Sequence, residues 1–203
     1  MTEDSQEEKM LQVRLAYRYL FDFHDRLRST IDEFSSQFVG FEYCHADTIY
    51  HNRPSFRTNP HDKWLIDYFP LMNYTMLYKH ADLSQILSIR TYCDTGVSDF
   101  FDEGKKSDLK IREIKSEAKD SNSEIYVGLL NVSNAKGLSK DDLIEIWNAQ
   151  EDPDDEKPVP IKFKAHSSYK GSFQHTWLEI STLKNKSEIL KQAKRIQKIL
   201  LPK

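Results

Sequence analysis

A long amphipathic stripe near the start of the chain constrains its fold more than any other feature. From Lys9 to about Phe38, apolar residues recur at steps of three and four, the spacing of one helical face. Tyr17 and Phe21 widen this stripe, so we expect the helix to pack on more than one neighbour. Gly40 follows where a helix stop is expected. The stripe consists of Val13, Ala16, Leu20, Phe23, Leu27, Ile31, Phe34 and Phe38.

The rest of the chain alternates strand-like segments with two further helical patterns. Ser139 and Asp142 form a capping box that predicts a helix over residues 140–150, and a basic amphipathic helix is predicted over residues 187–201, packed on a sheet. Helices at both ends around about five strands, with hairpin-like links, indicate an α+β fold with a mostly antiparallel sheet. The strand-like segments, rich in β-branched and aromatic residues, are 71–79, 85–93, 123–132, 160–166 and 172–181.

Length and composition bound the organisation of the chain. The 203 residues fit a single domain over residues 9–203, preceded by an acidic flexible tail at residues 1–8. Residues 151–160 carry six charged residues and three prolines and are expected to form an exposed acidic linker. No apolar run approaches 18 residues, and the acidic start lacks a secretory signal, so we expect a soluble cytoplasmic protein. The net charge of −3 gives no overall attraction to nucleic acid or to a membrane.

An aromatic, histidine-bearing segment at residues 40–64 has no clear helical or strand period. Irregular segments longer than about 12–15 residues are uncommon inside a domain and are usually functional or disordered. Disordered segments are poor in aromatic residues, so we expect this one to be ordered and to form a binding surface. Its arginines and aromatics suit an anion, a base or a protein surface. The residues concerned are Tyr50, Arg53, Phe56, Arg57, Lys63 and Trp64.

The same segment contains candidate metal ligands. A zinc or iron site needs three or four converging donors, and a neutral imidazole is the commonest ligand. The spacings here match no specific metal pattern, so we expect these side chains to satisfy the loop backbone, with no metal or cofactor bound. The donors are Cys44, His45, Asp47, His51, His61 and Asp62.

Residues 109–115 offer a second candidate site. Read as a strand, they place Glu113 and Lys115 on one face, as in a metal-dependent nuclease, with Asp94 or Asp99 as a further carboxylate. Read as a helix, they form an ordinary solvated face, which is the interpretation we favour. The chain has no phosphate loop, no dinucleotide fingerprint, no serine-hydrolase elbow and no zinc-protease or CxxC motif.

The C-terminal hairpin is the third candidate. If Leu178 points into the core, period two collects a basic and aromatic set on the opposite sheet face. A tryptophan among lysines could stack a base or bind a partner, and two histidines could supply an acid and a base. The alternative is that Trp177 lies under a helix, surrounded by lysine side chains. The set is Lys162, Lys164, His166, His175, Trp177 and Glu179.

Two function classes follow from these candidates. The first is a non-enzymatic recognition or regulatory module, which binds a protein partner, or alternatively nucleic acid, through residues 40–64 and the basic C-terminal surface. The second is a small nuclease or related phosphodiester-processing enzyme, which uses His166 and His175 or the Glu113–Lys115 pair. We favour the first, because no acid/base set has a clear spacing. Homo-oligomerisation is compatible with either class.

Overall fold

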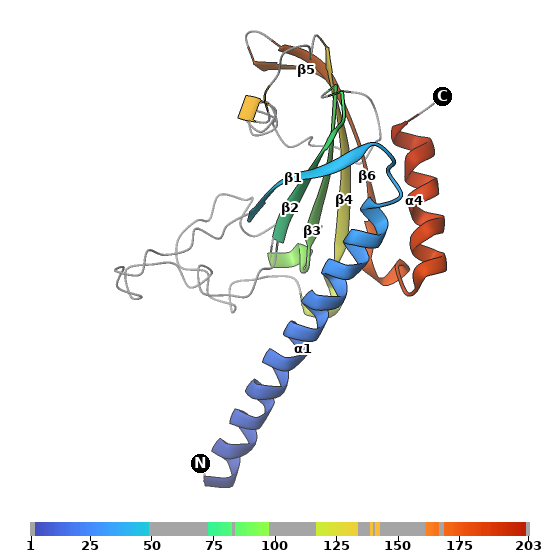
Figure 1. Cartoon of the computed structure of the whole chain (residues 1–203). Helices are drawn as coiled ribbons and strands as arrows, with labels where there is room; N and C mark the ends of the chain where they lie inside the picture. Colours follow the sequence, from blue (N-terminus) through green and yellow to red (C-terminus); the bar gives the residue numbers. More distant parts are fainter. Residues whose placement is uncertain are drawn as a thin grey trace.

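The computed structural model describes residues 3–48, 73–82, 84–97, 117–133, 139, 141–142, 161–166 and 169–201. A long helix leads into the strands, and a second helix follows the last strand (Figure 1). Two short 3-10 turns, η4 (Ala118–Asp120) and η5 (Ile180–Thr182), precede β4 and follow β6. The main elements are α1 (Glu3–Ser35), β1 (Phe41–Thr48), β2 (Asn73–His80), β3 (Gln85–Tyr92), β4 (Glu124–Ser133), β5 (Ile161–His166), β6 (Tyr169–Glu179) and α4 (Lys186–Leu200).

The strands form one antiparallel sheet. Within the described ranges it has six strands in the order β1-β2-β3-β4-β6-β5, and every neighbouring pair is antiparallel. The predicted α+β fold is confirmed, and so are the β2–β3 and β5–β6 hairpins. Ser139 and Asp142 make the predicted capping contacts, with 3.1 Å from the Asp142 N–H to the Ser139 hydroxyl oxygen. The remainder of the helix predicted at 140–150 and the linker at 151–160 lie outside the described residues.

Strand β1 occupies the first part of the segment that the sequence marked as irregular. The ladder pairs Tyr43 with Tyr78 and then His45 with Leu77, so the strand carries a bulge at Cys44. A bulge inserts one extra residue and breaks the alternation of side chains, which is why no period-two pattern appears in this strand. The expectation of irregular structure is therefore wrong for Phe41–Thr48.

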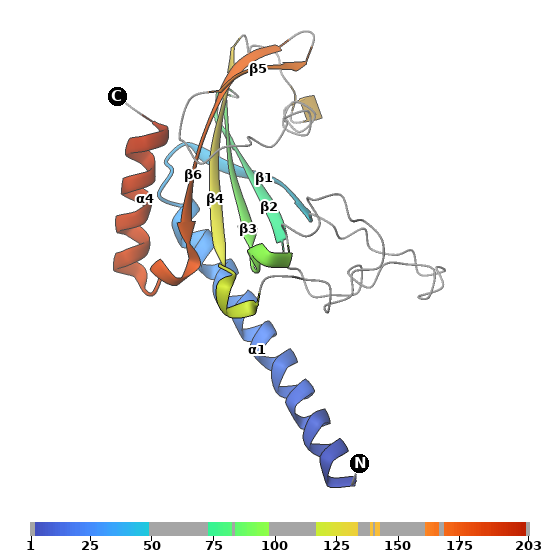
Figure 2. The same cartoon turned by 180° about the vertical axis from the view of Figure 1, so that it is seen from behind.

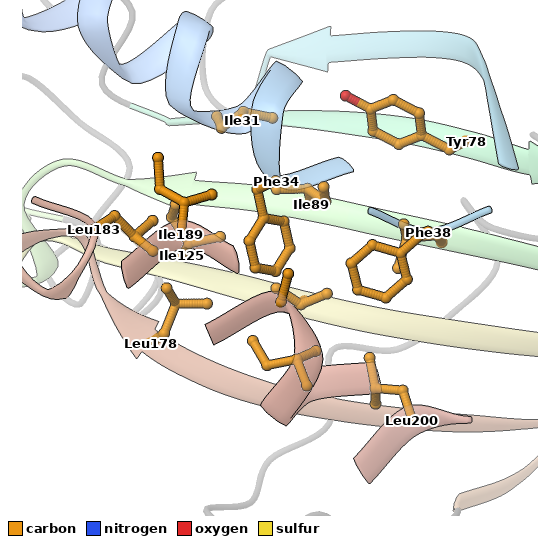
Figure 3. Close-up of a cluster of buried hydrophobic side chains, with 14 of the residues drawn as sticks. Ile31, Phe34, Phe38, Tyr78, Ile89, Ile125, Leu178, Leu183, Ile189 and Leu200 are labelled. Atoms are coloured by element: carbon orange, nitrogen blue, oxygen red, sulfur yellow. The ribbon is translucent and has the colours of Figure 1, made fainter. Parts of the chain in front are cut away.

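One face of the sheet carries the main hydrophobic core. Helix α4 packs on β4, on β6 and on the C-terminal part of α1. Leu27, Ile31 and Phe34 of α1 are at most 2% exposed and belong to one cluster with the sheet residues. Figure 3 shows Ile31 and Phe34 in this cluster. From α4 the buried residues are Ile189, Ala193, Ile196 and Leu200, as the amphipathic pattern predicted.

Helix α1 extends well beyond the sheet that it packs on. It begins at Glu3, six residues before the predicted start at Lys9, so residues 3–8 are helical. Figures 1 and 2 both show its N-terminal half leaving the sheet, with no described element beside it. Residues 6–22 are all exposed. Only the C-terminal part of the predicted stripe therefore contributes to the core.

The turn between β2 and β3 is held by a carboxylate. Asp82 Oδ1 accepts hydrogen bonds from the Ser84 hydroxyl at 2.5 Å and the Ser84 N–H at 2.9 Å, and it lies 2.8 Å from His80 Nδ1. These contacts, those of Ser84 first, hold the pKa of Asp82 well below its usual range. Gly40, which precedes β1, lies beside this turn; it has φ of 90°, and a Cβ there would lie 2.7 Å from His80 Nε2.

We predict that Asp82→Asn lowers the free energy of unfolding at pH 7 because the charged acceptor is lost. A carboxylate whose pKa is depressed in the folded state stabilises above its unfolded pKa of about 4, and this contribution declines as the pH falls. Urea denaturation of both proteins between pH 7 and pH 3 measures the difference. The difference should shrink on acidification; a difference that grows would contradict this role of Asp82.

The second face of the sheet has close packing around a glycine of β4. A Cβ on Gly128 would lie 2.6 Å from Phe173 Cζ and 2.7 Å from Ser88 Oγ. Both neighbours are buried, Phe173 at 4% and Ser88 at 0% exposure. Glycine is therefore required here so that the Phe173 ring can lie against the β4 backbone.

Gly128→Ala should lower the free energy of unfolding by about 1–3 kcal/mol through overpacking. Chemical denaturation of the variant and of the parent protein gives this value. The double variant Gly128→Ala with Phe173→Leu serves as the control, because it removes the ring that the new methyl group meets. A Gly128→Ala protein as stable as the parent would show that the strand has room for the methyl group.

Candidate functional site

Most of the side chains in the predicted binding segment fall outside the described residues. This applies to Tyr50, Arg53, Phe56, Arg57, Lys63 and Trp64, to His51 and His61, and to the Glu113–Lys115 pair. His45 is described and is half-buried in β1. No three histidine, cysteine or acidic side chains within the described ranges are grouped to hold a metal ion. The functional hypotheses on the remaining residues stay predictions.

The C-terminal hairpin is described, and its register determines which residues are neighbours. Leu178 is buried in the core, and His175 and Trp177 belong to the opposite face of β6, as predicted. The ladder pairs Ile161 with Phe173 and Lys162 with Ser172. Phe173 belongs to the same face of β6 as His175 and Trp177, and its partner in β5 is Ile161. The expected basic face required Lys162 at this position, but Lys162 pairs with Ser172.

The two histidines of the hairpin lie far apart along it. His166 pairs with Tyr169, which precedes His175 by six residues in β6. At about 3.4 Å per residue, the two backbone positions are roughly 20 Å apart. A further shift in register lies between Phe163 and His166. The ladder therefore does not bring His166 and His175 together.

His175 belongs to an aromatic cluster on the second face of the sheet. Its ring stacks on Tyr126, with centroids 5.1 Å apart and planes inclined by 23°, and on Phe173 at 5.9 Å. Trp177 meets Tyr126 edge-on at 4.5 Å, and the Arg90 guanidinium lies 6.0 Å from the Tyr126 ring centroid. His175 and Tyr126 are only 2% and 4% exposed.

This burial decides what the aromatic cluster can do. A general acid or base must reach a substrate proton, and a side chain that is 2% exposed and stacked between rings has no such access. Trp177, at 40% exposure, is the one member of the cluster with a large accessible surface. The cluster consequently stabilises the sheet, and Trp177 alone presents a surface to a ligand.

His175→Ala should lower the free energy of unfolding by about 1–3 kcal/mol, because it removes a buried ring from the stack. Glu179→Ala, at an exposed position of the same strand, should change it by less than about 0.5 kcal/mol. Thermal or urea denaturation compares the two variants with the parent protein. Equal stability of His175→Ala and the parent would mean that the ring contributes nothing to packing.

Neither cysteine is suited to nucleophilic chemistry. Cys44 is buried in β1. Burial, with a smaller contribution from Asp94, raises the pKa of Cys93 to about 12. A thiol with this pKa has very little thiolate at neutral pH, and the thiolate is the reactive form.

The C-terminal helix presents a basic surface to solvent. Lys191, Lys194, Arg195 and Lys198 of α4 are exposed. Lys186 forms an ion pair with Glu33 of α1 at 3.1 Å, which joins the two helices at the edge of the core. Gln197 also donates a hydrogen bond to the Gln37 carbonyl oxygen. Lys191 pairs with Glu188 of the same helix at 3.4 Å, and together with Lys194, Arg195 and Lys198 it gives α4 a basic exposed face.

Among the described residues, the most extended exposed apolar surface lies on α1, where the sequence predicted buried contacts. Tyr17 is 65% exposed and Phe21 is 78% exposed, and neither packs on a second neighbour within the described part of the chain. Helix α1 does pack on more than one neighbour, the sheet and α4, as expected, but it does so through its C-terminal part and not through Tyr17 and Phe21. The other large apolar side chains exposed on this half are Met10, Leu11, Val13, Leu15, Tyr19 and Leu20, at 40–72%.

Several of these exposed side chains lie on the same face of α1 as the residues that enter the core. Positions 10, 13, 17, 20, 24, 27, 31, 34 and 38 alternate strictly in steps of three and four. We call Met10, Val13, Tyr17 and Leu20, with the adjacent Phe21, the exposed seam. Leu27, Ile31, Phe34 and Phe38 are the buried half of the same seam. The strict repeat from Met10 onward is the sequence signal that could have identified this surface.

Charge is balanced along the exposed half of α1. Residues 6–22 contain three acidic and three basic side chains, so the formal charge of this stretch is zero. The charged residues are Glu7, Glu8, Lys9, Arg14, Arg18 and Asp22. None of the helices within the described ranges is both long and apolar enough to cross a membrane.

Comparison with known proteins gives one match. A family model described as PM0109 matches residues 3–201. No curated protein and no solved structure matches the chain. The matched range includes α1, the whole sheet and α4.

Proposed function

The chain belongs to the PM0109 family, and we propose that it is a non-enzymatic recognition module that binds a protein partner through the exposed seam of α1. The observation that carries this proposal is the contrast within one helix. Leu27, Ile31 and Phe34 are at most 2% exposed, whereas Tyr17 and Phe21 on the same helix are 65% and 78% exposed.

The size of this apolar surface supports a binding role. Single exposed apolar residues are ordinary on protein surfaces, but a contiguous group commonly marks an interaction site. The exposed seam is contiguous because its members recur at helical spacing over three turns. It includes Tyr17, and tyrosine is among the residue types that dominate binding energies.

The energetics of the helix also favour a partner. An isolated helix draws little stability from its own hydrogen bonds, and most helices in proteins depend on packing of an apolar face. Residues 6–22 have no such packing within the described chain. A partner that covers the seam would supply it. Because the stretch has no net charge, the partner surface should be apolar and not strongly charged.

Residues 40–64 and the basic face of α4 remain part of the proposal as secondary contacts. The exposed Lys191, Lys194 and Arg195 suit acidic groups on a partner. Such exposed charges mainly affect the rate of association and its salt dependence. The apolar seam is therefore expected to dominate affinity.

The proposal predicts that Tyr17→Ser with Phe21→Ser abolishes partner binding without loss of fold. Tagged protein is expressed in its native host, and stoichiometric co-purifying chains, including an untagged copy of this chain, are quantified by mass spectrometry. Leu11→Ser with Leu15→Ser is the matched control, since these residues are similarly apolar and exposed but lie away from the seam.

The parent and control proteins should retain a stoichiometric partner that the Tyr17/Phe21 variant loses. Circular dichroism should show that all three are folded and unfold cooperatively, because the altered side chains are exposed. Equal partner recovery with the Tyr17/Phe21 variant would contradict the proposal.

A further inference from the structure

We infer that the partner of the exposed seam is a second copy of this chain, paired antiparallel through α1 about a two-fold axis. This inference rests on the proposed function, because it names the partner of the same surface. It follows from four observations: the repeat of the seam, the length of the exposed stretch, the residue from which α1 packs on the sheet, and the exposed apolar area of the seam.

The repeat of the seam is that of a coiled coil. Alternating steps of three and four give an average of 3.5 residues, the period at which two helices keep one seam in mutual contact. The spacing continues from Met10 to Phe34 within α1, with His24 as its one polar position. The core covers it from Leu27 onward, and residues 6–22 are left exposed. A second helix of the same period would complete it.

The exposed stretch is complementary to itself when two copies run antiparallel. With the axis near Leu15, Met10 of one copy meets Leu20 of the other, and Val13 meets Tyr17. Each of these layers pairs a larger with a smaller or more flexible side chain, as layers of an antiparallel pair do when they interdigitate. All eight side chains of the four layers are buried at once in this register.

The position of the sheet favours antiparallel over parallel pairing. From Leu27 onward the seam is occupied by the chain's own core, so a partner helix can extend only about as far as this point. In the antiparallel pair, the helix start at Glu3 of each copy lies level with Leu27 of the other, where the core begins, and the two sheets lie at opposite ends. A parallel pair would bring both sheets to the same end and would set Lys9 beside Arg14 of the second copy.

Electrostatics neither drive nor oppose the pairing as a whole. The stretch has zero formal charge, so two copies do not repel each other. Arg14 lies next to the two-fold axis and therefore approaches Arg14 of the second copy. The long side chains of both arginines can extend into solvent on either side. Antiparallel packing also sets the helix dipoles in opposite directions.

The area is of the order that a stable dimer needs. An aromatic side chain buries about 150–250 Å², and Tyr17 and Phe21 expose 65% and 78% of theirs, so two copies would bury about 400–700 Å² from these residues alone. Met10, Val13 and Leu20 add to this, each 40–49% exposed. Specific interfaces start at about 1,200 Å² in total, so the five residues of the seam supply a large part of the area that a stable dimer needs.

Sedimentation equilibrium of the purified full chain tests the stoichiometry. The parent protein should form a concentration-dependent dimer of the 23.9 kDa chain. Tyr17→Ser with Phe21→Ser should raise the dimer Kd by about 30-fold or more, the effect of losing one interface hot spot. Leu11→Ser with Leu15→Ser should leave the Kd within about threefold.

Disulfide trapping tests the orientation. Met10→Cys protein mixed with Leu20→Cys protein should form a mixed disulfide under mild oxidation, and each variant alone should form little homodimer. Strong cross-linking of Met10→Cys to itself would overturn the antiparallel arrangement. The native Cys44 is buried, and burial raises the pKa of the Cys93 thiol to about 12, so both react slowly at neutral pH.

The outcomes separate this inference from the proposed function. A parent protein that stays monomeric at all concentrations, while a different host protein is retained only with an intact seam, overturns the second copy and leaves the recognition function. A monomeric protein whose host partners do not depend on Tyr17 and Phe21 overturns both.

Discussion

The fold depends on the packing of the C-terminal part of α1 against one face of the antiparallel sheet. Leu27, Ile31 and Phe34 are almost completely buried there, and α4 packs on the same helix and on β4 and β6. Removing this contact would expose the sheet face that carries Leu87, Ile125 and the rest of the core cluster. The helix is longer than this contact requires, and the excess length carries the exposed seam to which the proposed partner would bind.

The two described candidate surfaces differ in what their burial permits. The cluster of Tyr126, Phe173 and His175 is tightly stacked and nearly closed to solvent, so it contributes to stability. The exposed seam of α1 is large, apolar and uncovered within the described chain. A side chain contributes binding energy only if it is accessible before binding and desolvated after it, and the seam meets the first condition.

Much of the fold could be predicted from the sequence because it follows from local periodicity. The helical stripe, the amphipathic α4 and the strands β2, β3, β4 and β6 were all expected near their observed positions. Strand β1 was missed because its bulge at Cys44 disrupts the alternation of side chains. The pairing of β5 with β6 also differs from the prediction, because Ile161 and not Lys162 lies opposite Phe173. The register of two strands is set by the hairpin that joins them and cannot be read from either strand alone. Periodicity identified the seam as apolar but could not show which part of it the sheet would cover.

In the proposed arrangement, one seam on α1 is covered by the chain's own core in one half and by a second copy in the other. Hydrogen–deuterium exchange of α1 amides over a range of protein concentrations tests it most directly. Protection of residues 6–22 should rise with concentration and vanish on dilution, while protection around Ile31 and Phe34 stays constant. Protection of residues 6–22 that does not change with concentration would contradict this arrangement.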